Sequence, residues 1–170
     1  SSDLSATRHV MEALYDGPID YRAYHYHPVL LERLPSLADG DAITRTVNAR
    51  TGTQVVDAAG EVVKLAEGMR IHPAGCRTDD CAVEFDGDPI KMERMEVSFI
   101  LREDVVWSDG EPLTAHDSAF AYEIAVDPAT SGRRDLTDRT ANYYAQGDYR
   151  TKWIGVPGYF PPTYFLNFYP

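Results

Sequence analysis

The sequence predicts an α+β fold in which a mostly antiparallel sheet is flanked by a few helices. Two runs rich in β-forming residues, 53–56 and 61–65, lie on either side of a turn segment that ends at Gly60, which is typical of a hairpin. A strand predicted for residues 91–101 brings the number of antiparallel strands to at least three, and a single helix is predicted after it.

The third strand is predicted by its alternating pattern. Met95, Val97, Phe99 and Leu101 recur with a period of two, so one face of this strand is expected to be buried. The segment 108–110 (Ser-Asp-Gly) then predicts a turn, because Asp bonds nearby backbone and Gly tolerates a positive φ. Trp107 is expected to pack under this turn, with stacking on a ligand as the alternative. Two further strands are predicted beyond the helix, at 140–144 and 148–155.

The helix is predicted to run from Ala115 to Val126. Thr114 suits the N-cap position, and Asp117 lies at the third helical position, where a carboxylate is favoured by the positive helix end. Pro128 stops the helix, because the residue before a proline is pushed out of the α region. The apolar stripe expected to face the core consists of Phe120, Ala121 and Ile124.

Composition sets limits on function. The chain has 170 residues, enough for one domain with a real core, and a net charge of −11. This charge argues against nucleic acid as a partner, since phosphate binding needs a basic surface. No apolar run approaches the length of a membrane span.

No cluster suited to bond chemistry stands out. His25 and His27 would share one face of a strand, but no third metal ligand is placed beside them. His116 and Asp117 could form half of an acid–base pair, but the cap position already explains Asp117, and no nucleophile motif is present. We therefore expect neither catalytic residues nor a metal nor a cofactor.

One long motif resembles a known family. The pattern comprises Phe99, Leu101, Arg102, Val105, Trp107, Asp109, Gly110, Pro112, Leu113, Thr114, Ala115, Asp117, Phe120 and Tyr122. It resembles the signature of the family 5 extracellular solute-binding proteins, the receptors of ABC importers. Ser118 departs from the pattern, because the family usually has an apolar residue there. Weaker matches in the expected order lie at residues 9–18, 28–35 and 158–166.

The resemblance implies a two-lobed architecture of the periplasmic-binding-protein type II class. Such receptors are much longer, so residues 1–170 would form the N-terminal part of one, with its smaller subdomain at about residues 40–150. The implied function is an extracytoplasmic component that binds a solute, in most cases a peptide, between its lobes without catalysis. The implied partners are the solute and the ABC permease subunits of a monomeric receptor that is periplasmic or lipid-anchored at the outer face of the membrane. The alternative is a sensing or surface-interaction module with the receptor fold.

The resemblance also suggests candidate site residues. Arg133 and Arg134 follow the signature helix in a loop where related receptors contact their ligands, although a solvated pair of charges explains them as well. Tyr15, at the end of a helix predicted for residues 4–15, is a further candidate. In an extracytoplasmic protein, Cys76 and Cys81, with a polar loop between them, are expected to form a disulfide; free thiols or a metal site are the alternatives.

Overall fold

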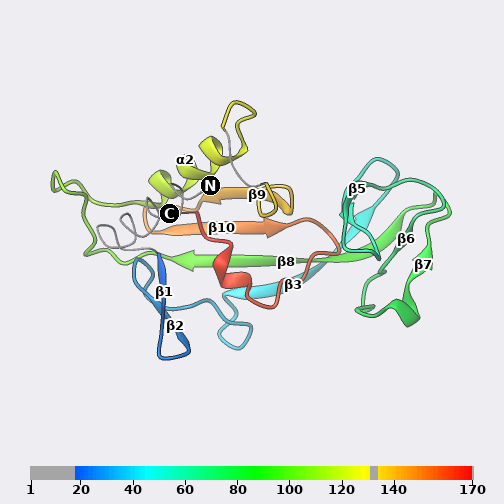
Figure 1. Ribbon diagram of the computed structural model, residues 1–170, viewed down its shortest axis with the longest axis horizontal. Coiled ribbons are helices and arrows are strands. Elements are labelled where there is room, and N and C mark those ends of the chain that lie inside the picture. Colours follow the sequence, from blue (N-terminus) through cyan, green and yellow to red (C-terminus); the bar gives the residue numbers. More distant parts are fainter. Residues whose placement is uncertain (1–17, 131–133, 170) are drawn as a thin grey trace, which may run out of the picture.

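The computed structural model describes residues 18–130 and 134–169. Its centre is a four-stranded sheet of order β3 (Ala42–Ala49), β8 (Ile90–Ile100), β10 (Arg150–Gly155) and β9 (Thr140–Ala145), with every neighbouring pair antiparallel (Figure 1). The predicted antiparallel sheet is therefore confirmed. The helix predicted for residues 4–15 lies outside the described residues.

The register of the sheet places its large apolar side chains in one row. Val97 pairs with Ala42 on one side and with Trp153 on the other, and Trp153 pairs with Tyr143. Because residues directly opposite one another point to the same face, these four side chains share one face, and all four are buried. The alternation of Met95, Val97, Phe99 and Leu101 thus correctly predicts the core face of β8.

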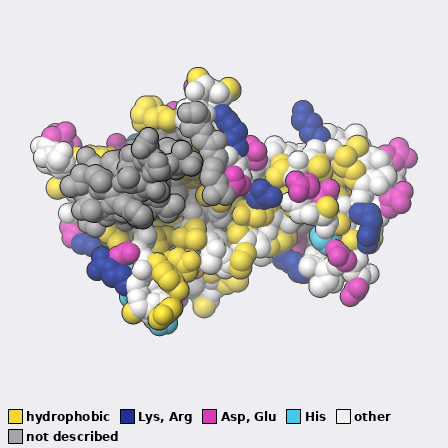
Figure 2. All heavy atoms as spheres, viewed as in Figure 1, with side chains coloured by type: hydrophobic (Ala, Val, Ile, Leu, Met, Phe, Trp, Pro, Cys, Tyr) yellow, Lys and Arg dark blue, Asp and Glu magenta, His cyan; other side chains and the backbone are white. Residues whose placement is uncertain are grey.

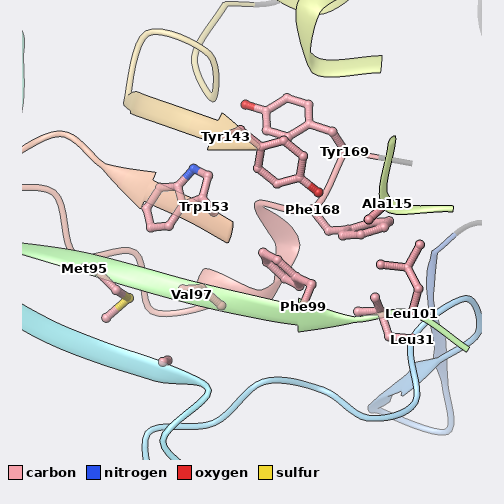
Figure 3. Packing of buried hydrophobic residues seen from close by; sticks show 11 residues of the cluster. Leu31, Met95, Val97, Phe99, Leu101, Ala115, Tyr143, Trp153, Phe168 and Tyr169 are labelled. Carbon is pink, nitrogen blue, oxygen red and sulfur yellow. The ribbon is translucent and has the colours of Figure 1, made fainter. Parts of the chain in front are cut away.

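Two segments cover this face. One is α2 (Ala115–Val126), which lies over β9 and β10. The other is the C-terminal segment, residues 156–169, which contains the 3-10 helix η2 (Tyr164–Leu166). Figure 3 shows Phe168 and Tyr169 of that segment pointing into the cluster. The ring centroids of Phe99 and Phe168 are 5.3 Å apart, and those of Tyr143 and Tyr169 are 4.9 Å apart, distances typical of favourable aromatic pairs.

A second, smaller core lies at one end of the sheet. It belongs to the β4–β7 unit, which consists of β4 (Gln54–Val56), β5 (Val62–Lys64), β6 (Arg70–Ile71), the 3-10 helix η1 (Asp79–Cys81) and β7 (Val83–Glu84). The predicted hairpin is confirmed as β4 and β5. Ala49 of β3 and Met92 of β8 reach into this core, so the two long strands connect both clusters (Figure 1).

A hairpin of β1 (Ile19–Arg22) and β2 (His25–Pro28) extends from the other end. Its two turn residues, Ala23 and Tyr24, have φ values of 50° and 65°, as a tight two-residue turn requires. Tyr24 at the tip is 89% exposed. Figure 2 shows hydrophobic side chains gathered on this side of the molecule, around the hairpin and the C-terminal segment.

Candidate functional site

The signature motif forms a turn and a capped helix. The N–H of Trp107 donates to the carbonyl of Glu111 at 2.8 Å, and Gly110 has a φ of +91° in the turn between them. The carboxylate of Asp117 accepts from the N–H of Thr114 at 2.7 Å and from its hydroxyl at 2.8 Å. Burial raises the pKa of Asp117, but these hydrogen bonds outweigh burial and hold the pKa below its ordinary value. The predicted turn, cap and helix bounds are confirmed.

The face that α2 buries is not the predicted one. Phe120 and Ile124 are 61% and 47% exposed, whereas Ala115 and Ser118 are buried. The prediction of a buried stripe at Phe120 and Ile124 is therefore wrong. The reason is that α2 turns Ser118 toward the sheet, where its hydroxyl finds hydrogen-bond partners.

A groove runs along the exposed apolar side of α2. It has a volume of about 200 Å³. Trp107, which was expected to pack under the turn, is 48% exposed and lies against this groove, so that expectation is also wrong. The lining is mostly apolar: Leu30, Trp107, Leu113, Asp117, Ser118, Phe120, Ala121, Ile124 and Phe168.

Buried hydroxyl groups join α2 to the sheet. Ser118 Oγ lies 2.7 Å from the hydroxyl of Tyr143, which in turn lies 2.9 Å from Thr151 Oγ1. Ser118 Oγ also donates to the carbonyl of Tyr169. These bonds explain why a polar residue is tolerated at position 118, since a buried hydroxyl costs little when it is hydrogen-bonded.

The same kind of contact continues into the C-terminal segment. Trp153 Nε1 donates to Thr140 Oγ1 at 2.8 Å, and that oxygen lies 3.1 Å from the hydroxyl of Tyr169. Burial raises the pKa of Tyr169 to about 12. The helix, β9, β10 and the C-terminal segment are thus held together by polar contacts inside an aromatic core.

Only one of the three candidate ligand residues lies in the described part of the chain. The guanidinium of Arg134 donates to the carbonyls of Val126, Asp127 and Thr130 at 3.2, 2.8 and 3.4 Å. These contacts satisfy carbonyl groups at the end of α2 and complement its negative end. A role of Arg134 toward a ligand stays a prediction, and Tyr15 and Arg133 lie outside the described residues.

The expected disulfide between Cys76 and Cys81 is present, with Cα atoms 5.7 Å apart. It closes a loop that carries Arg77, whose guanidinium lies 3.3 Å from the ring centroid of Phe160 and pairs with Glu93 at 2.6 Å. Sequence reasoning missed Arg77, because its partners lie 16 or more positions away in the chain and no local pattern marks them.

An acidic side chain is buried on the opposite face of the sheet. Glu96 is 4% exposed and pairs with Arg45, Arg94 and Lys152 at 3.1, 2.9 and 3.3 Å. Burial raises its pKa, but the hydrogen bonds from Arg94 and Lys152 and the charge of Arg45 outweigh it and lower the pKa. Glu96 therefore stays charged at neutral pH and compensates the charges around it.

The described residues hold no group of three His, Cys, Asp or Glu side chains that could bind a metal ion. His25 and His27 lie on β2, and no such group of three among the described residues includes them. No helix in residues 18–130 and 134–169 is long and apolar enough to cross a membrane.

Comparison with known proteins agrees with this picture. Residues 93–153 match the model of the bacterial extracellular solute-binding proteins, family 5 Middle. This segment therefore resembles the middle part of the family 5 solute-binding proteins. The resemblance drawn from the signature motif is thereby confirmed, and the matched family 5 segment contains β9, α2 and most of β8.

Curated relatives match over short stretches. The periplasmic oligopeptide-binding protein OppA of Haemophilus influenzae is 56% identical over 34 residues, which are 20% of this chain and 6% of that protein. The oligopeptide-binding protein OppA of Lactococcus lactis subsp. lactis is 41% identical over 59 residues, or 35% of this chain and 10% of that protein. The chain therefore matches only a small part of the length of these relatives.

One solved structure resembles the whole chain. The oligopeptide-binding protein from Thermus thermophilus, crystallised with a pentapeptide, superposes with a TM-score of 0.56 at 20% identity. The match covers 95% of this chain and 19% of that one. It confirms the predicted fold class, an antiparallel part of a two-lobed periplasmic-binding-protein architecture.

Proposed function

We propose that this chain is the N-terminal part of an extracytoplasmic solute-binding protein that delivers peptides to an ABC importer. The observation that carries the proposal is the family 5 segment at residues 93–153, set within a fold that resembles an oligopeptide-binding protein over 95% of the chain. The curated relatives reported above, all oligopeptide-binding proteins, support peptide as the solute.

In this proposal, two lobes of the complete receptor close about a hinge and hold the peptide between them. This chain supplies the smaller subdomain, at about residues 40–150, and the first strands that lead to and from the hinge. The receptor binds and releases its solute without bond chemistry, then docks on the permease subunits. It acts as a monomer outside the cytoplasm, free in the periplasm or lipid-anchored at the outer face of the membrane.

The loop after α2 is the proposed contact region, with Arg133 and Arg134 as ligand residues on one side of the cleft and Tyr15 as a third. Arg134 is held rigidly by the carbonyls of Val126 and Asp127, so its guanidinium would be positioned before a ligand arrives. A preorganised cation next to a cleft suits a peptide carboxylate, because arginine donates to carboxylates in a fixed geometry.

Calorimetry tests the proposal. The full-length receptor is titrated with a mixture of short peptides, in parallel with the 170-residue chain alone. We expect saturable binding by the full-length protein and no tight binding by this chain, since most of the cleft lies elsewhere. Micromolar peptide binding by this chain alone, or none by the full-length protein, would contradict the proposal. Arg133→Ala is the variant expected to weaken binding, and Arg50→Ala, an exposed arginine on the β4–β7 side, is the matched control.

A further inference from the structure

The loop closed by Cys76 and Cys81 touches the parts of the molecule on both sides of it. From inside the loop, Arg77 donates to Glu93 of β8 at 2.6 Å and stacks on Phe160 of the C-terminal segment. Stacking on an aromatic face combined with an ion pair is a strong anchor for a guanidinium. Arg77 is therefore a side-chain anchor between the disulfide loop of the β4–β7 unit and both β8 and the C-terminal segment, in addition to the core that the unit shares with β3 and β8.

On its other side the loop is held by β6 and the residue that follows it. Arg70 Nη2 donates to the carbonyl of Asp79 at 3.2 Å, and Asp79 Oδ1 lies 3.6 Å from His72 Nε2. The Nε2 atom of His72 is buried and has no hydrogen-bond partner within the described part of the chain. This side of the loop is thus held more loosely than the Arg77 side.

A cavity lies beneath the loop. Its volume is about 350 Å³, and its walls are the β4–β5 turn, the disulfide loop and the segment from Gly158 to Phe160. Gly158 has a φ of +88°, and a Cβ there would come within 2.5 Å of the carbonyl oxygen of Val56. The C-terminal segment consequently approaches β4 very closely at one edge of the cavity.

Two backbone hydrogen bonds hold the C-terminal segment at this edge, one with β4 and one with β8. The N–H of Val56 donates to the carbonyl of Pro157 at 2.8 Å, and the N–H of Gly158 donates to the carbonyl of Glu93 at 2.8 Å. Glu93 is also the partner of Arg77. If Arg77 lost its contacts, we would therefore expect the hydrogen bonds of these two amides to open first.

We propose that the Cys76–Cys81 disulfide is a redox-sensitive clasp that controls how firmly the β4–β7 unit is held against the C-terminal segment. Cys76 is 5% exposed, whereas Cys81 lies in an exposed position, so a reductant reaches Cys81 Sγ first. Reduction releases the loop, withdraws Arg77 from Phe160 and opens the cavity beneath it.

The chemistry needs a dithiol reductant. Its thiolate attacks Cys81 Sγ, the S–S bond breaks, and Cys76 leaves as a thiolate that takes a proton from water. The second thiol of the reductant then attacks the mixed disulfide, releasing Cys81 as a thiolate that is protonated in turn. The reductant ends as a cyclic disulfide, and two electrons and two protons have passed to the protein.

Amide hydrogen exchange of the oxidised and dithiol-reduced chain tests the clasp, with the amides of Val56 and Gly158 as reporters and that of Ser98 in β8 as the reference. Closing a loop of this length corresponds to about a 40-fold change in an opening equilibrium. We expect exchange at the two reporters to rise by about tenfold to 40-fold on reduction, and to rise before exchange at Ser98, which requires opening of the main sheet. Thiol labelling verifies the redox state.

Two variants separate the clasp from a general loss of stability. Arg77→Gln in the oxidised chain should speed exchange at both reporters, and reduction should then add little, because the anchor is already gone. Arg50→Gln, the matched loss of an exposed charge, should leave both amides unchanged. The proposal is overturned if reduction leaves Val56 and Gly158 unaffected, or if Arg77→Gln and reduction act independently.

Discussion

Replacing Tyr143 with Phe tests the hydroxyl contacts that join α2 to the sheet. The substitution keeps the ring and removes one oxygen, which lies 2.7 Å from Ser118 Oγ and 2.9 Å from Thr151 Oγ1. Ser118 still donates to Tyr169, but the hydroxyl of Thr151, at 0% exposure, loses this bond. A buried polar group deprived of its partner costs about 1–3 kcal/mol, so we expect Tyr143→Phe to lower the free energy of unfolding by about 2 kcal/mol.

Urea unfolding followed by circular dichroism measures this change. At 170 residues, a loss of about 2 kcal/mol corresponds to a fall in Tm of about 4–8 °C. Tyr144→Phe is the matched control, because the neighbouring tyrosine is 36% exposed, and it should change stability by less than about 0.5 kcal/mol.

A double-mutant cycle with Ser118→Ala identifies the contact itself. If the Ser118–Tyr143 bond stabilises the fold, the two losses are coupled by about 1 kcal/mol, as expected for residues in one hydrogen-bond network. A Tyr143→Phe protein as stable as the parent, or strictly additive losses in the cycle, would refute this reasoning.

Two further predictions concern Glu96 and Trp107. The folded-state pKa of Glu96 lies below its ordinary value of 4.5, so its contribution to stability is present above that pH and is lost as the pH falls through the folded pKa. Glu96→Gln should therefore lower the free energy of unfolding by about 3 kcal/mol at pH 7, since three cations lose their anion. Urea titrations should show the difference in free energy of unfolding between parent and variant narrowing below pH 4.5. A difference independent of pH would contradict this. Of the two tryptophans, Trp107 is 48% exposed and Trp153 is fully buried, so acrylamide should quench one component of the fluorescence. Trp107→Phe should remove that component. Quenching that is unchanged in the variant would contradict the exposed position of Trp107.

Local patterns predicted the elements that local interactions determine. The hairpin of β4 and β5, strand β8 and the bounds of α2 follow from alternation, turn residues and a cap, all of which act within a few positions of the chain. The disulfide was also predictable once an extracytoplasmic location was expected, because its partners lie on one short loop. These signals are present in the sequence without any knowledge of the tertiary structure.

The features that the sequence did not predict depend on distant partners. Strand β3 has the sequence Ala-Ile-Thr-Arg-Thr-Val-Asn-Ala, whose polar residues hide its pairing with β8. The orientation of α2 was mispredicted because hydrophobicity alone favours burying Phe120 over Ser118, whereas the hydroxyl of Ser118 has buried partners on β9 and in the C-terminal segment. Glu96 is hidden in a strand pattern in which a carboxylate normally indicates an exposed face.

The candidate site shows the same difference between features set by local interactions and features set by distant partners. The signature motif indicated the family through its turn, its cap and its helix, and these residues prove to stabilise the scaffold. Arg134 was singled out as a ligand residue from its position after α2, and its contacts at the helix end could not be read from spacing alone. In the proposed receptor, the residues that contact a solute depend on which loops meet across the cleft, and no local pattern in the sequence marks that meeting.

Native mass spectrometry of the full-length protein, purified without added peptide, tests the proposed peptide receptor most directly. If the proposal is right, the spectrum shows the protein carrying one equivalent of short peptides, which are released on denaturation and sequenced. A protein that carries no ligand and also takes up none from a peptide mixture, or one that carries a sugar or a metal chelate instead, would contradict it.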